Sequence, residues 1–153
     1  MRVWRLCLRR LAATVCDGNG ARIAGGRWSP KGLPVVYTAS SLALAAMELF
    51  VHLEIEYAGH LFIALPLDVP DDLPLSHIRA QELPPDWRDQ PAPVALRATG
   101  EKWFRNGTTV GLVVPSAVVP PENNLLLNPT HRDFGKIAIH AAEDPLSERE
   151  VTV

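Results

Sequence analysis

The fold is decided in residues 25–52, which read GGRWSPKGLPVVYTASSLALAAMELFVH. Glycines and prolines punctuate the first third of this stretch and predict a loop. Residues 35–38 have the composition of a strand, and Ser40 or Ser41 is suited to cap a helix that begins at Leu42. The stretch therefore predicts a loop, a strand and a helix in succession.

The helix is apolar on every side over residues 42–51, and we expect it to end near residues 54–59. Such a pattern predicts burial rather than a surface position, and yet the helix contains Glu48. An ionised carboxylate that is buried without partners is so costly that it pairs, protonates or faces a polar cavity. Glu48 therefore needs polar or charged partners from elsewhere in the chain.

Arg27 and Tyr37 are the candidate partners of Glu48 that lie nearest to it in the sequence. The two glycines before Arg27 let the backbone approach a ligand, and a guanidinium matches the geometry of phosphate or carboxylate. A cation, an aromatic ring and a carboxylate in one cleft would suit a nucleotide-sugar substrate. The alternative is a structural ion pair between Glu48 and Arg27, with Tyr37 as a half-buried strand residue. The residues alone leave both interpretations open.

Length and composition predict one domain over residues 1–153, because a chain of 153 residues with 47% hydrophobic residues can bury a core of its own. The formal net charge is −2 and the basic residues are scattered, which disfavours nucleic-acid binding as the main activity. Arg2, Arg5, Arg9 and Arg10 form the one basic cluster. The odd spacing of Arg2 and Arg5 predicts that they point to opposite faces of a strand.

Cys7 and Cys16 are the two cysteines of the chain, and their spacing fits neither a zinc site nor a disulfide framework. The N-terminus has no apolar run of signal-peptide length, and no stretch approaches the length of a membrane span. We therefore expect a cytoplasmic protein without a membrane partner.

The remaining elements are strands and helices in mixed order, which favours an α+β fold, a compact domain with a mixed sheet and flanking helices. The proline-rich residues 66–93 are expected to form loops. The expected strands are 3–8, 61–67, 76–82, 111–116, 123–128 and 137–142, the expected helices are 94–105 and 131–136, and a turn is expected at 17–20.

Several apparent motifs carry little weight. Glu54-Ile55-Glu56 has the Glu-x-Glu form of arginine-modifying ADP-ribosyltransferases, but it follows a helix instead of opening a late strand. Glu48 and His52 share a helix face, and two potential ligands without a third make a weak metal site. Ser116 ends a buried strand, where it could cap the strand or reach a cleft, and no partner signature supports a triad nucleophile.

Taken together and in order, a set of short motifs resembles the RES domain family, and the resemblance spans nearly the whole chain. The family is named after an Arg, a Glu and a Ser, which correspond here to Arg27, Glu48 and Ser116. The last residues, 146–153, lack the Phe-Asp-x-Arg-Leu ending typical of the family. The motifs are GGRW at 25–28, VVYTA at 35–39, SLA at 41–43, VPSA at 114–117, ENN at 122–124 and NPTH at 128–131.

The resemblance implies a fold similar to ADP-ribosyltransferases and a toxin of a type II RES–Xre toxin–antitoxin module that consumes NAD and arrests growth. Arg27 and Arg5 would hold the NAD phosphates, and Tyr37 would pack at the nicotinamide ribose. Glu48 would be the key carboxylate and Ser116 would orient it or the substrate. Asn124 is a further candidate for substrate binding, its alternative being turn chemistry.

The resemblance also implies an NAD glycohydrolase or NAD phosphorylase, with an ADP-ribosyltransferase that modifies a host protein as the alternative. NAD would be the substrate, and no cofactor or metal is implied. The expected partners are an Xre-type antitoxin and a second copy of the chain, with DNA bound only through the antitoxin. Cleavage of the nicotinamide–ribose bond passes through an oxocarbenium-like state, which a nearby carboxylate stabilises.

Overall fold

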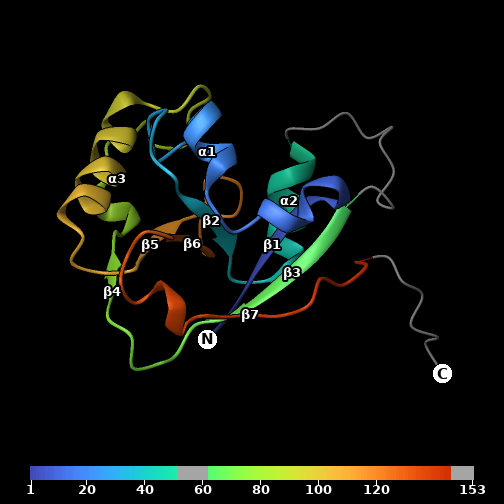
Figure 1. Cartoon of the computed structure of the whole chain (residues 1–153). Helices are drawn as coiled ribbons and strands as arrows, with labels where there is room; N and C mark the ends of the chain where they lie inside the picture. Colours follow the sequence, from blue (N-terminus) through green and yellow to red (C-terminus); the bar gives the residue numbers. More distant parts are fainter. Residues whose placement is uncertain (52–61, 146–153) are drawn as a thin grey trace.

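The computed structural model describes residues 1–51 and 62–145. One mixed sheet and three α-helices organise this part of the chain (Figure 1). The helices are α1 (Asn19–Ala24), α2 (Leu42–Val51) and α3 (Val94–Asn106), with 3-10 turns η1 (Arg9–Thr14), η3 (Ala80–Glu82) and η4 (Phe134–Lys136). The strands are β1 (Arg2–Leu8), β2 (Val36–Ala39), β3 (Phe62–Asp68), β4 (Leu75–His77), β5 (Gly111–Pro115), β6 (Asn123–Leu127) and β7 (Ala138–Ile139).

The strands lie in the order β4-β5-β6-β2-β1-β3-β7. All neighbours are antiparallel except β4 and β5, which run parallel. β1 pairs with β3 along its whole length but with β2 at the single pair Trp4 and Ala39. The sheet therefore opens between β1 and β2, and this opening becomes important for the site.

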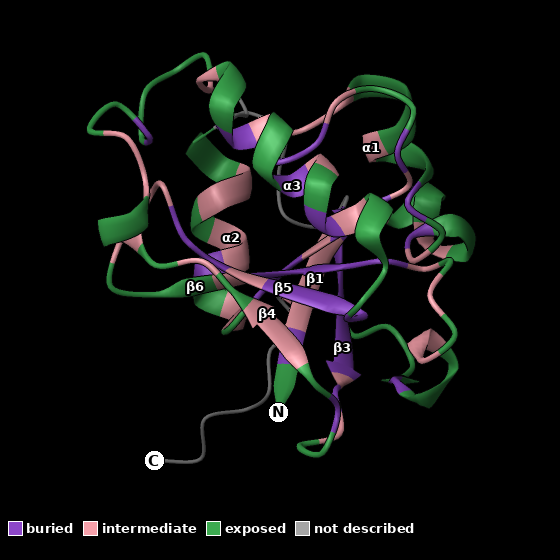
Figure 2. Cartoon of the chain, turned by 90° about the vertical axis from the view of Figure 1, so that its left-hand side faces the viewer, coloured by how far each residue is buried: buried purple, intermediate pink, exposed green. Residues whose placement is uncertain are grey.

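The core lies on both faces of the sheet, because neighbouring strand residues point to opposite sides. Leu125 and Leu127 of β6 join a cluster with Val3, whereas Leu126 joins one with Trp28 and Trp103 on the other face. In Figure 2 the buried colour is concentrated on the strands, and the outward sides of the helices are exposed. The two views both place α1, α2 and α3 above the strands.

The α+β fold class expected from the order of elements is confirmed. The predicted strands near 3–8, 35–38, 111–116 and 123–128 and the helix at 94–105 are all present. Ser41 caps α2 as expected, since its hydroxyl accepts a hydrogen bond from the Leu44 N–H at 3.0 Å. The predicted end of that helix and residue 61 of the next strand lie outside the described residues.

The predicted burial of α2 is wrong. Among its residues Leu44 is buried, whereas Met47, Phe50 and Val51 are 49%, 48% and 57% exposed. The helix rests on β1 and β2 with one side, and no described element covers its outer side. An apolar composition on all sides therefore did not mean burial on all sides.

Three shorter elements also differ from expectation. Residues 17–20 do not form a free turn: the Asp17 carboxylate accepts the Asn19 N–H at 2.8 Å and α1 begins there. The strand expected at 76–82 is the three-residue β4 followed by η3, and the helix expected at 131–136 is the 3-10 turn η4. In each case a proline or a local side-chain bond limits the regular element to one short turn or a few strand residues.

The strand expected at 137–142 is reduced to Ala138–Ile139. Its partner β3 contains Pro66, whose carbonyl accepts the His140 N–H at 3.0 Å. Because the N–H and C=O of a strand residue point the same way, Pro66 lacks the donor that would continue the ladder. The chain still follows β3, through the bridge between Ala64 and Glu143. No described helix has the length and apolar character that a membrane crossing requires.

Candidate active site

A cleft of about 510 Å³ opens beside the place where β1 and β2 part. Its walls come from β1, β2, α2, the loop after α1 and the turn after β5. Five residues singled out from the sequence line it: Arg5, Arg27, Tyr37, Glu48 and Asn124. The sixth, Ser116, lies directly behind Glu48. The fold thus gathers residues that are up to 119 positions apart in the chain into one cavity.

Ser116 holds the Glu48 carboxylate. The Ser116 hydroxyl donates to Glu48 Oε1 at 2.6 Å, and the serine is 0% exposed. The same oxygen accepts the N–H groups of Val118 and Val119, each at 3.1 Å. A hydroxyl has one proton and two lone pairs, so these two bonds leave its proton for Glu48 alone. The direction of the hydrogen bond is therefore set by the backbone turn after β5.

Arg5 is a largely buried cation that lines the cleft and, together with Glu48, a smaller pocket that shares residues with it. One of its terminal N–H groups donates to the Tyr37 carbonyl at 2.8 Å, across the gap between β1 and β2. Its Nε is a buried donor without a hydrogen-bond partner among the described residues, and no described carboxylate pairs with it. Burial lowers the pKa of Arg5, although a guanidinium stays charged. Arg2, on the other side of β1 as the odd spacing predicted, pairs instead with the exposed Asp68.

Arg27 is the second cation, and backbone carbonyls position it. Its terminal nitrogen donates to the carbonyl oxygens of Trp87 at 2.9 Å and Asp89 at 3.1 Å. Burial lowers the pKa of Arg27, and the Glu48 and Asp89 carboxylates partly offset this. No ion pair joins Arg27 to Glu48, because each is held by another group. The alternative of a structural Glu48–Arg27 ion pair is therefore wrong.

Tyr37 is fixed by the loop that carries Arg27. Its hydroxyl accepts the Trp28 N–H at 3.2 Å and shares a 2.7 Å hydrogen bond with the Ser29 hydroxyl. Burial raises the pKa of the Tyr37 phenol, which keeps it neutral near pH 7. A Cβ at Gly26 would collide with the phenol oxygen, so a glycine is needed for the loop to lie against the ring. Asn124 completes the wall and donates to the Thr38 carbonyl at 3.3 Å.

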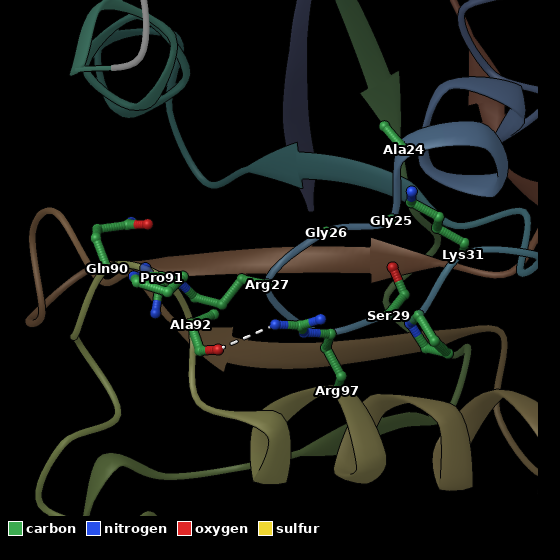
Figure 3. Close-up of a pocket in the computed structure, with 11 residues that line it drawn as sticks. Ala24, Gly25, Gly26, Arg27, Ser29, Lys31, Gln90, Pro91, Ala92 and Arg97 are labelled. Carbon is green, nitrogen blue, oxygen red and sulfur yellow. Dashed lines mark hydrogen bonds between the residues drawn. The ribbon is translucent and has the colours of Figure 1, made fainter.

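A second hollow of about 450 Å³ adjoins the cleft and is drawn in Figure 3. Both cavities are lined by Gly25, Gly26, Arg27 and Gln90. The hollow is additionally lined by Lys31 and Arg97, which the sequence did not single out. They belong to a loop and to α3, and no motif links them; only the packing of α3 on the loop brings them together.

The other sequence candidates add no further site residue within the described part of the chain. Glu54, Glu56 and His52 lie outside the described residues. Within residues 1–51 and 62–145, no three histidines, cysteines or acidic residues are grouped as metal ligands would be. Cys7 and Cys16 are free thiols in the structure, and burial raises the pKa of Cys16 to about 11.

Comparison with known proteins gives a consistent result over most of the chain. A family model described as the RES domain matches residues 2–148. The chain is 38% identical over 134 residues to "Toxin Res" of Yersinia enterocolitica, covering 88% of each protein. It is 39% identical over 137 residues to the "Prs ADP-ribosylating toxin" of a Sphingobium species, covering 85% of this chain and 83% of that one.

A solved structure shows the same fold. A chain in the crystal structure of the Mycobacterium tuberculosis MbcT–MbcA toxin–antitoxin complex superimposes with a TM-score of 0.76 at 22% identity. The match covers 94% of this chain and 82% of the other. At this identity the similarity establishes the shared fold.

Proposed function

This chain belongs to the RES domain family, and from that premise we propose that it is a toxin that consumes NAD by breaking the bond between nicotinamide and ribose. The observation that carries the proposal is that one cleft brings together a serine-fixed carboxylate and two arginines that form no ion pair with a described carboxylate. The relatives named as toxins support the biological role.

The unpaired arginines favour an anionic substrate. A buried donor without a partner costs about 1–3 kcal/mol, and the Nε of Arg5 is such a donor among the described residues. A diphosphate bound at Arg5 and Arg27 would give both guanidinium groups the charge-assisted hydrogen bonds that the protein does not supply. The cost of burying Arg5 is then understandable as preorganisation for a ligand.

Glu48 would stabilise the positive charge that develops on the ribose. When the bond from C1′ to the pyridinium nitrogen breaks, its electron pair leaves with nicotinamide, which departs neutral and needs no general acid. The ribose is left oxocarbenium-like, and a carboxylate held close to it lowers the energy of that state. Ser116 keeps Glu48 in place, and the Tyr37 ring and Asn124 would contact the nicotinamide ribose.

The acceptor of the ADP-ribose group defines the reaction. Attack by water would make the protein a glycohydrolase, in which the water oxygen bonds to C1′ and loses a proton. Attack by orthophosphate would make it a phosphorylase, in which an unprotonated phosphate oxygen bonds to C1′. The second candidate function is transfer to a host protein, which the name of the 39% identical Sphingobium relative, an ADP-ribosylating toxin, favours. The same cleft would serve all three reactions.

An antitoxin is the partner we propose. The structural match belongs to a toxin–antitoxin complex, and a cleft that opens to the surface can be blocked by a bound protein. We propose an Xre-type antitoxin that covers the cleft in the cytoplasm and provides the only contact with DNA, and we propose separately that the toxin is a homodimer.

The decisive experiment is to incubate the purified protein with NAD, with and without orthophosphate, and to separate nicotinamide from the ribosyl product. Loss of NAD supports the proposal, and the product identifies water or phosphate as the acceptor. Labelled NAD with a cell lysate tests transfer to protein. Glu48→Gln is the matched inactive control. If neither condition consumes NAD and no protein becomes labelled, the proposed function is wrong.

A further inference from the structure

The hollow next to the cleft lies on the far side of Arg27 from Glu48. The two cavities share the Gly25–Gly26–Arg27 segment and Gln90, but Glu48, Tyr37 and Asn124 line only the cleft. A group bound in the hollow would therefore be next to the proposed diphosphate position and away from the reacting carbon. About 450 Å³ is enough space for a sugar or a phosphate group.

All the charged residues that line the hollow are basic. Arg27, Lys31 and Arg97 line it, and none of its lining residues is acidic. No described carboxylate forms an ion pair with Lys31 or Arg97. The carboxylates that act on Arg27 are those of Glu48, in the cleft, and Asp89, beside Gln90 in the sequence. The hollow thus concentrates cations without the carboxylates that would neutralise them.

The donors in the hollow are largely unused. Arg97 of α3 donates one hydrogen bond, to the Ala92 carbonyl at 3.2 Å, which is the dashed line in Figure 3. Lys31 makes no side-chain hydrogen bond to a described residue, and its side chain passes over Gly25. Gln90 brings an amide to the same space (Figure 3). Guanidinium and ammonium groups that share a concave site match the oxygens of a phosphate.

We propose that this hollow is a second phosphate site, which binds a phosphate monoester beside the dinucleotide diphosphate. The inference rests on the proposed function for the position of the diphosphate at Arg27. With nicotinamide at Glu48, the adenosine half of the substrate extends past Arg27. The 2′-phosphate of NADP then lies beside Lys31 and Arg97. The chain would then prefer NADP to NAD. Orthophosphate has the same chemistry and is the other source of such a group.

The test measures binding rather than turnover. Glu48→Gln protein is titrated calorimetrically with NAD, NADP and orthophosphate at constant ionic strength, alone and combined with Lys31→Ala or Arg97→Ala. Lys102→Ala is the matched control, because Lys102 is an exposed lysine of α3 that lines neither cavity. We expect NADP to bind roughly tenfold more tightly than NAD, and Lys31→Ala to remove most of that difference, as for the loss of one charge-assisted hydrogen bond.

Each outcome decides something. If NADP has no advantage but orthophosphate binds and Lys31→Ala abolishes that binding, the phosphate site stands and its ligand is the free ion. If neither ligand responds to Lys31→Ala or Arg97→Ala while thermal melting shows folded protein, the site does not exist. Failure of the proposed function would appear separately, as the absence of NAD consumption by the unmodified protein, because orthophosphate binding does not require turnover.

Discussion

The carboxylate and the cations of the cleft are held differently, and we call Glu48 with Ser116 the carboxylate end and the two arginines Arg5 and Arg27 the cation end. At the carboxylate end, one buried side chain, Ser116, holds Glu48 by a hydrogen bond whose direction is set by the turn after β5. At the cation end, Arg5 and Arg27 are held by main-chain carbonyls. The carboxylate end therefore depends on the identity of a single side chain, whereas the cation end depends on the path of the backbone.

This difference has a physical consequence for mutations. A carbonyl is present whatever the residue, so changes around Trp87 or Asp89 leave the contacts of Arg27 in place as long as the loop keeps its path. The loop that carries Arg27 is itself fixed by packing: Gly100 of α3 lies so close to the Trp28 carbonyl that a Cβ there would collide with it. We expect the carboxylate end to control kcat and the cation end to control substrate binding.

The largest expected effect is that of Glu48→Gln. The amide keeps the shape of the side chain and can still accept the Ser116 hydrogen bond, but it carries no charge to stabilise an oxocarbenium-like state. We expect kcat for nicotinamide release to fall about 100- to 1000-fold, with KM and the melting temperature nearly unchanged. Glu101→Gln, at an exposed ion pair on α3, is the control. Activity retained in Glu48→Gln would remove Glu48 from the chemistry.

Arg27→Lys tests the cation end. Lysine keeps the positive charge but loses the planar fork that reaches two carbonyls and a ligand at once. We expect KM for NAD to rise about 10- to 100-fold, in line with the value of hydrogen bonds to charged groups, and kcat to change much less. The measurement is initial-rate kinetics over a range of NAD concentrations. A fall in kcat at constant KM would show that the two ends are not separate in function.

Ser116→Ala tests whether the serine positions Glu48. The substitution strands two buried N–H groups, so we expect a loss of about 1–3 kcal/mol in the free energy of unfolding. We also expect kcat to fall roughly tenfold, the lower end for the loss of one hydrogen bond to a charged group, with KM unchanged. Ser116→Cys has a weak S–H donor and should recover part of kcat. If kcat is unchanged while stability falls, Ser116 has a structural role alone.

The sequence predicted the strands and the helix α3 because their signals are local. Runs such as VVYT and GLVVP, bounded by glycine or proline, identify strands wherever they fold. The turn signal at 17–20 failed because aspartate, glycine and asparagine suit a helix start as well as a turn. The burial of α2 failed because a helix does not encode which of its apolar sides other elements will cover.

The residues of the site likewise fall into those that the sequence marks and those that only the fold brings together. Arg27 and Glu48 were candidates from the residue pattern, Ser116 received its role through the resemblance to a family, and the contacts of each became visible only in the fold. That Ser116 donates to Glu48 depends on the N–H groups of Val118 and Val119, which no motif marks. Lys31 and Arg97 were missed because they meet only when α3 packs on the loop. Local composition cannot show which residues of separate elements come to line the same cavity.

The smallest expected effect lies outside the cleft, at Asp68. This carboxylate is paired with basic side chains, whereas Arg5 has no ion-pair partner among the described residues. Asp68 accepts two hydrogen bonds from Arg2 and one from His140, and these hold its pKa well below the usual range. A carboxyl whose pKa is lowered by folding adds stability above its ordinary pKa, and this is lost as the pH falls through the lowered value. Because the groups are exposed, the effect is modest. Asp68→Asn should flatten the acid limb of melting temperature against pH, with NAD turnover unchanged at pH 7; parallel acid limbs in both proteins would contradict it.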